Sequence, residues 1–344
     1  MSRIDIPAGQ RDYKVTDEYV LPVEASVLSV SPHAHYLARD IKAFATPPDG
    51  GARQWLIWIK QWDFNWQGVY EYETPVRLRR GTRITMEFTY DNSAGNRRNP
   101  NQPPKRVTYG PRSSDEMGDL WLQLLSERDA DRDRLVRDDR DRTFAALIAE
   151  AERLLRTSPD AEHYNLLAAR YIEAGRLDAA RAPLAAALQL RPSYTNARVN
   201  LGSILQAQGQ PGDAIAQFRA AVAADDASFD AHFSLGTALN GAARFEEAAA
   251  QLQRAAALDE GSAEAQNNLA VALGSLGRVA DAIAHLERAV AIEPRYADAH
   301  SNLGFALGQT GRRDEALRHL RQALQISPGH PGATQQLAEL GVQP

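Results

Sequence analysis

The chain has 344 residues, 44% hydrophobic and 24% charged, which is ordinary for a globular protein of about two domains. Its formal net charge is −5, made up of +1 over residues 1–125 (16 basic and 15 acidic) and −6 over the remainder, so neither part has the basic field that nucleic-acid binding requires. The absence of cysteine excludes disulfides, thiolate zinc sites and thiol catalysis.

Two further expectations concern membranes and location. The sequence holds no run of 18 apolar residues, so no membrane span is expected. Residues 1–13 lack the apolar core of a signal peptide, and the residues themselves do not identify a compartment.

Residues 1–125 are predicted to form an all-β domain. Ile84, Met86, Phe88 and Tyr90 alternate with mostly polar residues, which is typical of a half-buried strand. Similar short runs, separated by clusters of Gly, Pro, Asn and Asp, occur at 23–30, 33–45, 54–60, 69–73, 75–80, 105–109 and 118–125. About eight such strands with no helical pattern among them predict a β-sandwich, jelly-roll-like in character.

Two histidines are placed to bind a single ion. His33 and His35 alternate along a predicted strand and therefore project from the same face. Met117 lies in a polar, turn-like segment, where a purely core-filling methionine is unusual. Two imidazoles and a thioether suit copper, above all Cu(I). The alternative is that the histidines are ordinary strand residues and that Met117 packs in the core.

The sequence around these residues resembles a known family. The runs SPHAHYLARDIKAF, LIWIKQWDFNWQGVYEYETPVRL, GTRITMEFTYDNSAGNRRNPNQPPKRVTYG and SSDEMGDL, within residues 5–125, resemble the C-terminal catalytic domain of the copper type II, ascorbate-dependent monooxygenases, bacterial members in particular. The family includes peptidylglycine α-hydroxylating monooxygenase and dopamine β-monooxygenase. The resemblance implies a β-sandwich, one oxygen-activating copper on His33, His35 and Met117, ascorbate or another reductant, and a periplasmic or otherwise extracytoplasmic location.

The sequence also departs from this family. Members hydroxylate a C–H bond with two coppers held by consecutive sandwich domains, but residues 1–125 contain no histidine besides His33 and His35 for the electron-relay copper. Ser31 stands where the peptide-amidating enzyme has an arginine, and Asp119 and Trp121 replace its asparagine and tyrosine. Either the chain is part of a longer protein, or a separate copper domain is its partner, or it no longer catalyses.

Four tryptophans lie close together at Trp55, Trp58, Trp62 and Trp66. Such a cluster can form a platform on which a sugar or another ligand stacks, but packing in the core or at a strand edge is the expectation here. Residues 126–142, with 13 charged residues of mixed sign among 17, are expected to form a solvated linker, which could be helical.

Residues 143–344 show a period of 34 residues. The positions that recur are leucine, a small residue directly after it, and two alanines further on. The leucines are Leu167, Leu201, Leu235, Leu269 and Leu303. The pattern resembles tetratricopeptide repeats (TPR) and predicts an α-helical solenoid of five full repeats at about 161–330, a half repeat at 143–159 and a capping helix at 332–340.

The first helix of each repeat is expected to line a concave surface. Asn200, Asn268 and Asn302 directly precede three of the repeat leucines, and such an asparagine ladder can bind the backbone of an extended peptide or protein segment. A structural role for these amides is equally open. This half has no lysine, so the clamp that some TPR proteins use for a chain terminus is not expected.

Two functions follow. The first is the oxygen-activating half of a copper-dependent monooxygenase, with a TPR domain that binds a partner protein. The second is a non-catalytic TPR scaffold that carries a copper-binding or degenerate sandwich domain.

Overall fold

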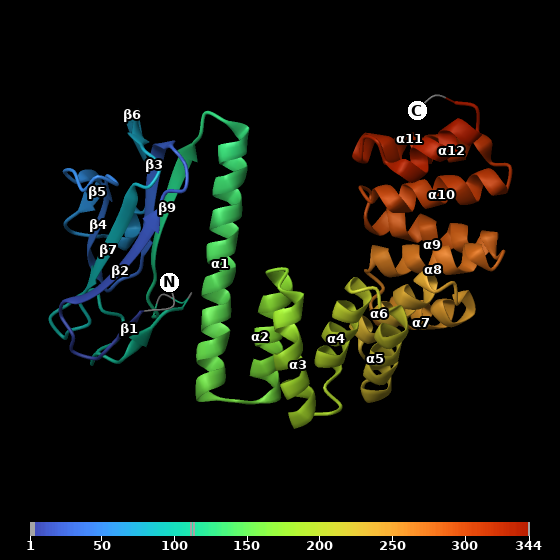
Figure 1. Cartoon of the computed structure of the whole chain (residues 1–344), viewed down its shortest axis with the longest axis horizontal. Coiled ribbons are helices and arrows are strands. Elements are labelled where there is room, and N and C mark those ends of the chain that lie inside the picture. The colour runs from blue at the N-terminus through green and yellow to red at the C-terminus, as the bar shows by residue number, and fades with distance from the viewer. Residues whose placement is uncertain (1–3, 111, 113, 343–344) are drawn as a thin grey trace. The chain divides into compact units, whose positions relative to one another are not determined.

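The computed structural model describes residues 4–110, 112 and 114–342, with the backbone alone for Trp66. The chain divides into two compact units, Met1–Glu150 and Ala151–Pro344, each of which is considered by itself (Figure 1).

The first unit is rich in β-sheet. Its strands are β1 (Asp5–Ile6), β2 (Tyr13–Val20), β3 (Ala25–Ala34), β4 (Ala38–Thr46), β5 (Gln54–Ile59), β6 (Tyr70–Leu78), β7 (Arg83–Tyr90), β8 (Val107–Thr108) and β9 (Gly118–Leu125), with a short 3₁₀ helix at Phe64–Trp66. A four-stranded sheet has the order β2-β7-β4-β5, a three-stranded sheet has the order β6-β3-β9, and β1 pairs with β8. Every pairing between these strands is antiparallel.

Buried side chains from the two larger sheets form common clusters. One cluster joins Val27 and Val30 of β3 with Ala43 of β4 and Ile84 of β7, and all four are almost inaccessible to solvent. The alternation of Ile84, Met86, Phe88 and Tyr90 expected from the sequence is that of β7, whose members contribute to these clusters. The N-terminal unit is therefore a sheet-rich region with an apolar interior.

Two strands of this unit, the short β1 and the longer β2, were not predicted from the sequence. β2 (Tyr13–Val20) alternates half-buried and exposed residues along its length, but its outward positions include Lys14 and Glu18 and its inward positions include Asp17. Charged residues on both faces hide the period of two that otherwise identifies a strand. The two strands predicted within 69–80 are one continuous strand, β6, from Tyr70 to Leu78. The single strand predicted at 33–45 is wrong, because β3 ends at Ala34 and β4 begins at Ala38.

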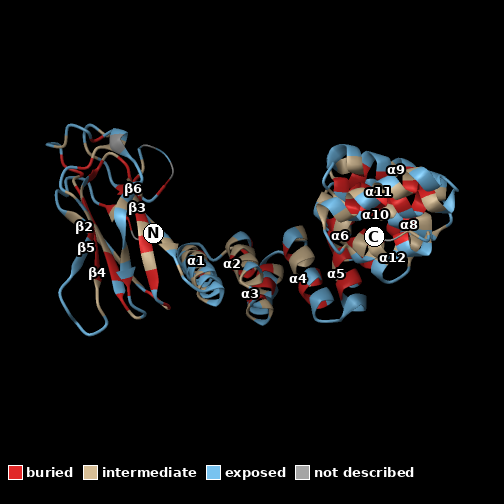
Figure 2. Cartoon of the chain, turned by 90° about the horizontal axis from the view of Figure 1, so that it is seen from above, coloured by how far each residue is buried: buried red, intermediate tan, exposed pale blue. Residues whose placement is uncertain are grey.

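Most of the charged segment 126–142 is helical. α1 (Asp129–Thr157) is 29 residues long and is coloured mainly as exposed in Figure 2. Within the first unit it packs against β2, because the Arg142 guanidinium lies over the Tyr19 ring at 4.6 Å and donates to the Glu18 carbonyl at 3.2 Å.

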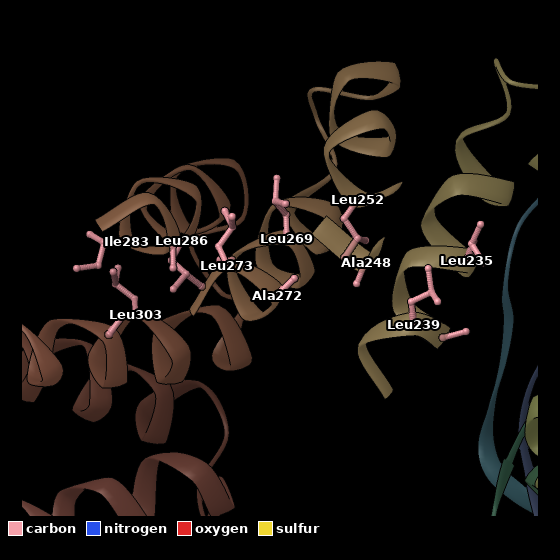
Figure 3. Close-up of a cluster of buried hydrophobic side chains, with 14 of the residues drawn as sticks. Leu235, Leu239, Ala248, Leu252, Leu269, Ala272, Leu273, Ile283, Leu286 and Leu303 are labelled. Atoms are coloured by element: carbon pink, nitrogen blue, oxygen red, sulfur yellow. The ribbon is translucent and has the colours of Figure 1, made fainter. Parts of the chain in front are cut away.

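The second unit is an all-α solenoid, as the 34-residue period predicted. Its helices are α2 (Ala161–Glu173), α3 (Leu177–Leu190), α4 (Thr195–Ala207), α5 (Pro211–Ala224), α6 (Phe229–Gly241), α7 (Phe245–Leu258), α8 (Ala263–Ser275), α9 (Val279–Ile292), α10 (Ala297–Gln309), α11 (Arg313–Ile326) and α12 (Pro331–Glu339). Successive helices pair within each repeat, and the apolar cluster runs on from one pair to the next (Figure 3).

The small residues after the repeat leucines allow the paired helices to approach closely. A Cβ added to Gly236 would lie 2.5 Å from Leu252 Cγ, and one added to Gly304 would lie 2.7 Å from Leu320 Cγ. Both distances are far shorter than van der Waals contact, so only glycine fits at this spacing. The period of 34 in the sequence therefore reports a packing requirement.

The turn inside each repeat uses a left-handed backbone. Gly175, Gly209, Gly277 and Gly311 have φ between 71° and 80°, and Ala243 takes the same place in the third repeat with φ of 55°. Glycine adopts this region freely, whereas an L-residue is disfavoured there. None of the helices in the part of the chain that the structure describes is long and apolar enough to cross a membrane.

Candidate functional site

The first candidate site is the end of the β3–β9 pair. The imidazoles of His33 and His35 lie edge to face with centroids 5.3 Å apart. The pairing of β3 with β9 ends at Ala34 opposite Gly118, so His35 directly follows the last pair on one strand and Met117 directly precedes it on the other. The three residues expected to bind copper therefore lie at one end of the same strand pair; Ser113 of the SSDEM motif lies outside the described residues.

Protein acceptors hold one nitrogen of each ring. His33 Nδ1 is hydrogen-bonded to Gln67 Oε1, and His35 Nδ1 lies 3.1 Å from the Asp115 carbonyl oxygen. An imidazole bonded through Nδ1 keeps Nε2 for another partner, which is how metal-binding histidines are commonly oriented.

Glu116 connects the segment that follows β3 with the segment that precedes β9. Its carboxylate, inaccessible to solvent, accepts hydrogen bonds from the backbone N–H groups of His35 (2.5 Å), Leu37 (2.8 Å) and Met117 (3.1 Å). Burial raises the pKa of Glu116 to about 7, and the three backbone donors oppose that rise. In the sequence, Glu116 is only one residue of the SSDEM motif, and nothing there indicates that it closes this end of the sheet.

Asp119 adds a negative group at the same place. It pairs with His33 across the strands, is 5% exposed, and its Oδ1 has no hydrogen-bond partner in the described part of the chain. Burial raises the pKa of Asp119, while the imidazoles of His33 and His35 counteract this. A buried carboxylate oxygen without a donor is costly, so the site favours positive charge.

The three residues expected to bind copper offer two imidazoles and one thioether. Within the described residues, no group of three or more His, Cys, Asp or Glu side chains is placed to hold a metal ion. A set of two imidazoles and one thioether is of a different kind and suits Cu(I). Beside His35, a cavity of about 170 Å³ is lined by residues that include Trp62, Phe64 and Arg98.

The second candidate site is the surface formed by the first helices of the repeats. These helices, α2, α4, α6, α8 and α10, contact one another from repeat to repeat, and α10 also contacts α12. In a TPR solenoid this continuous layer is the concave face.

Amide side chains link neighbouring first helices on this face. The Asn200 amide donates to Asn165 Oδ1 at 2.9 Å, the Asn302 amide to Asn267 Oδ1 at 2.9 Å, and the Asn268 amide to Thr237 Oγ1 at 3.2 Å. These bonds give the ladder a structural role. A side-chain amide carries two donor hydrogens and an acceptor oxygen, so each residue retains capacity for a ligand.

A second pattern on this face was missed by the sequence analysis. Two residues after the repeat leucines of α8 and α10 stand Val271 and Phe305, which are 39% and 47% exposed. Glu264 and Asp298, exposed, lie seven residues earlier, on the same side of each helix. The 34-residue period contained this signal, because it aligns position 305 with 271, 237 and 203.

Each first helix in the C-terminal repeats thus presents an acid, a polar group and an apolar group in sequence. α8 carries Glu264, Asn268 and Val271; α10 carries Asp298, Asn302 and Phe305. A Cβ built on Gly308, one turn beyond Phe305, would meet no atom within 4 Å, so open space adjoins the exposed ring.

Comparisons with known proteins agree with the repeat architecture. Two tetratricopeptide repeat family models match residues 199–265 and 261–329. The C-terminal part of the chain therefore carries tetratricopeptide repeats, as its sequence predicted. None of the findings supports a copper monooxygenase domain in residues 1–125.

Several solved structures are similar to this chain. YrrB, described as a TPR protein with an unusual peptide-binding site, is 26% identical, with 55% of this chain and 97% of that chain covered and a TM-score of 0.48. MamA is 27% identical, with 50% and 97% covered and a TM-score of 0.43. PilF of Pseudomonas aeruginosa is 21% identical, with 53% and 84% covered and a TM-score of 0.48. No curated protein matches the chain.

Proposed function

Proceeding from a chain that carries tetratricopeptide repeats, we propose that it is a non-catalytic scaffold whose concave TPR face binds a partner protein. The observation that supports this most directly is the exposed pair of Val271 and Phe305, next to acidic and amide groups on the same helices. Exposed aromatic rings on a concave surface are typical of binding anchors.

The apolar, amide and acidic groups of the concave TPR face indicate which residue types the partner carries. An apolar side chain of the partner packs between Val271 and Phe305, and its backbone bonds to the amides of Asn268 and Asn302. Glu264 and Asp298 attract basic residues on either side of that anchor; Asp298 accepts a hydrogen bond from His330 Nε2 at 2.8 Å, which orients it. The partner is therefore an extended protein segment with an apolar residue flanked by Lys or Arg.

A peptide selection tests this. Peptides enriched from a random display library on the full chain are expected to contain an apolar residue between basic ones. Phe305→Ala is expected to weaken the best peptide at least ten-fold, and Arg321→Ala, an exposed change on the second helix α11, is expected to leave it unchanged. Enriched peptides that bind both variants equally well contradict the proposal.

A second candidate function belongs to the sheet-rich unit: His33, His35 and Met117 bind one Cu(I). Two rings oriented through Nδ1, with the buried oxygen of Asp119 beside them, support this donor set. Copper there would supply a soft, redox-active cation. The oxygenase reaction and the reductant expected from the family resemblance find no support in the comparisons, and the proposed scaffold does not require them.

The strand orders β2-β7-β4-β5 and β6-β3-β9 also favour a jelly-roll-like sandwich for this unit, since strands distant in sequence alternate in both sheets.

Competition titration of the full chain with a Cu(I) chelator tests the proposed copper site at His33, His35 and Met117. One copper per chain is expected, lost in His35→Ala and weakened in Met117→Ile. Equal binding in the wild type and both variants excludes these ligands.

A further inference from the structure

A pair of exposed aromatic rings in the first unit lies outside both sites. Trp55 and Trp58 of β5 are 48% and 47% exposed, and their rings stack with centroids 5.1 Å apart at an interplanar angle of 20°. Packing in the core or at a strand edge was expected for the tryptophan cluster: Trp62, which is 3% exposed, is in the core, and Trp55 and Trp58 lie half exposed on the edge strand β5. Adjoining large apolar rings that remain exposed to water often mark a binding surface.

A bulge places both tryptophans on one face. β4 pairs Phe44 with Trp55 but Ala43 with Ile57, so β5 carries one extra residue between the pairs. Without it, positions 55 and 58 would point to opposite faces of the sheet. Ala43 and Leu56 are in the buried cluster, so Phe44, Trp55 and Trp58 belong to the outer face of the four-stranded sheet.

This aromatic row adjoins a cavity of about 580 Å³ on the same outer face. Phe44 forms its apolar part and contacts Trp55 edge to face at 5.5 Å. The remainder of the lining is rich in hydrogen-bonding groups: Thr16, Glu18, Thr46, Arg53, Arg83, Thr85 and Glu87. Glu18 Oε2 accepts from Arg83 Nη1 at 2.8 Å, so part of this polar wall is already ordered.

Basic side chains lie over the aromatic rings of this face. Lys60 and Lys42 place Nζ at 4.8 and 5.2 Å from the Trp58 ring, and the Arg53 guanidinium lies 4.4 Å from the Phe44 ring. Lys42 pairs with Asp40 at 2.8 Å, whereas neither Arg53 nor Lys60 has an ion pair within the described residues. Exposed cation–π contacts are weak, so these cations can turn toward an anion.

From this combination we infer that the outer face of the sheet β2-β7-β4-β5 is a binding site for an acidic oligosaccharide, of the uronic-acid type. A sugar ring has one face of C–H groups, which packs on the electron-rich face of an indole, and its hydroxyls take the Thr, Glu and Arg groups of the cavity. Its carboxylate meets Arg53 and Lys60. The inference is independent of the proposed TPR function.

Titration of the full chain with tetragalacturonic acid, followed by calorimetry, tests the inference. We expect binding at least ten-fold tighter than that of a neutral galactose tetrasaccharide in 50 mM salt. Trp55→Ala and Trp58→Ala are each expected to weaken binding at least ten-fold. The double change Arg53→Gln with Lys60→Gln is expected to remove the preference for the acidic sugar.

Trp121→Ala is the matched control. Trp121 is 65% exposed on β9, in the other sheet, so its loss removes an even more exposed indole without touching the proposed site. Near-ultraviolet circular dichroism verifies that each variant is folded. The inference is overturned if neither sugar binds, if Trp121→Ala weakens binding as much as Trp55→Ala, or if only extended peptides bind at this face.

Discussion

The turn inside the third repeat allows a quantitative test of how a left-handed backbone conformation affects the stability of the array. Ala243 has φ of 55°, whereas glycine occupies the same place in the other four repeats. Its hydrogen bonds match theirs: Ala243 N donates to the Asn240 carbonyl at 3.0 Å, as Gly277 N donates to Gly274 at 2.9 Å. The turns therefore share one geometry, and one residue is unsuited to it.

Ala243→Gly is expected to stabilise the array. The left-handed conformation costs an L-residue about 1–2 kcal/mol, and the greater freedom of glycine in the unfolded chain removes about 0.4–1 kcal/mol of that gain. The net gain is about 0.5–1 kcal/mol, or a rise in melting temperature of about 1–4 °C for a unit of this size. Gly277→Ala, where an added Cβ meets nothing within 4 Å, is expected to lose a similar amount.

Hydrogen exchange is the suitable assay, because repeat arrays do not always unfold in one step. Amides of α6 and α7 should exchange more slowly in Ala243→Gly, and those of α8 and α9 faster in Gly277→Ala. If both changes leave exchange unaltered, or if Ala243→Gly accelerates it, backbone conformation does not limit the stability of these turns and the reasoning fails.

Three further predictions concern packing and pH in the repeats. Gly304→Ala is expected to destabilise the array by about 1–3 kcal/mol in chemical denaturation, because its Cβ would lie 2.7 Å from a leucine of α11; an unchanged denaturation midpoint contradicts the close approach. Backbone and side-chain donors lower the pKa of Asp160 to about 2, so its cap of α2 stabilises above about pH 4 and is lost as the pH falls toward 2; thermal melts should show this in the wild type but not in Asp160→Asn. Burial, together with the adjacent His300, lowers the pKa of His319, so protonation disfavours the folded state and stability should fall as the pH drops below about 6.5. His319→Gln should reduce that loss, and an equally acid-sensitive variant would exclude His319 as its source.

The sequence predicted those features that repeat or alternate. The leucine period of 34 located the paired helices of the second unit because each repeat solves the same packing problem, and the alternation in β7 located a strand because one of its faces is buried. Features decided by contacts between distant residues were not predictable. The clamp of Glu116 on the backbone of His35 depends on a residue 81 positions away, and the stacking of Trp55 on Trp58 depends on a bulge that only the pairing of β4 with β5 reveals.

The histidine pair shows the limit of motif reasoning. The strand predicted at 33–45 is interrupted after Ala34, so the period of a strand does not by itself place His33 and His35 on one face. Their imidazole centroids nevertheless lie 5.3 Å apart, and Met117 directly precedes β9. A motif reports residue types, however, and binding depends on where the ring nitrogens and the sulfur point. The two functional hypotheses drawn from the sequence therefore have unequal support, and the repeats carry the stronger one.

The most direct test of the scaffold function is the dissociation constant of a selected peptide, measured for the wild type, Phe305→Ala and Arg321→Ala. The account predicts an increase of at least ten-fold for Phe305→Ala and no change for Arg321→Ala. A constant that is the same in all three proteins would show that the peptide does not bind on the concave face, and would contradict the central claim.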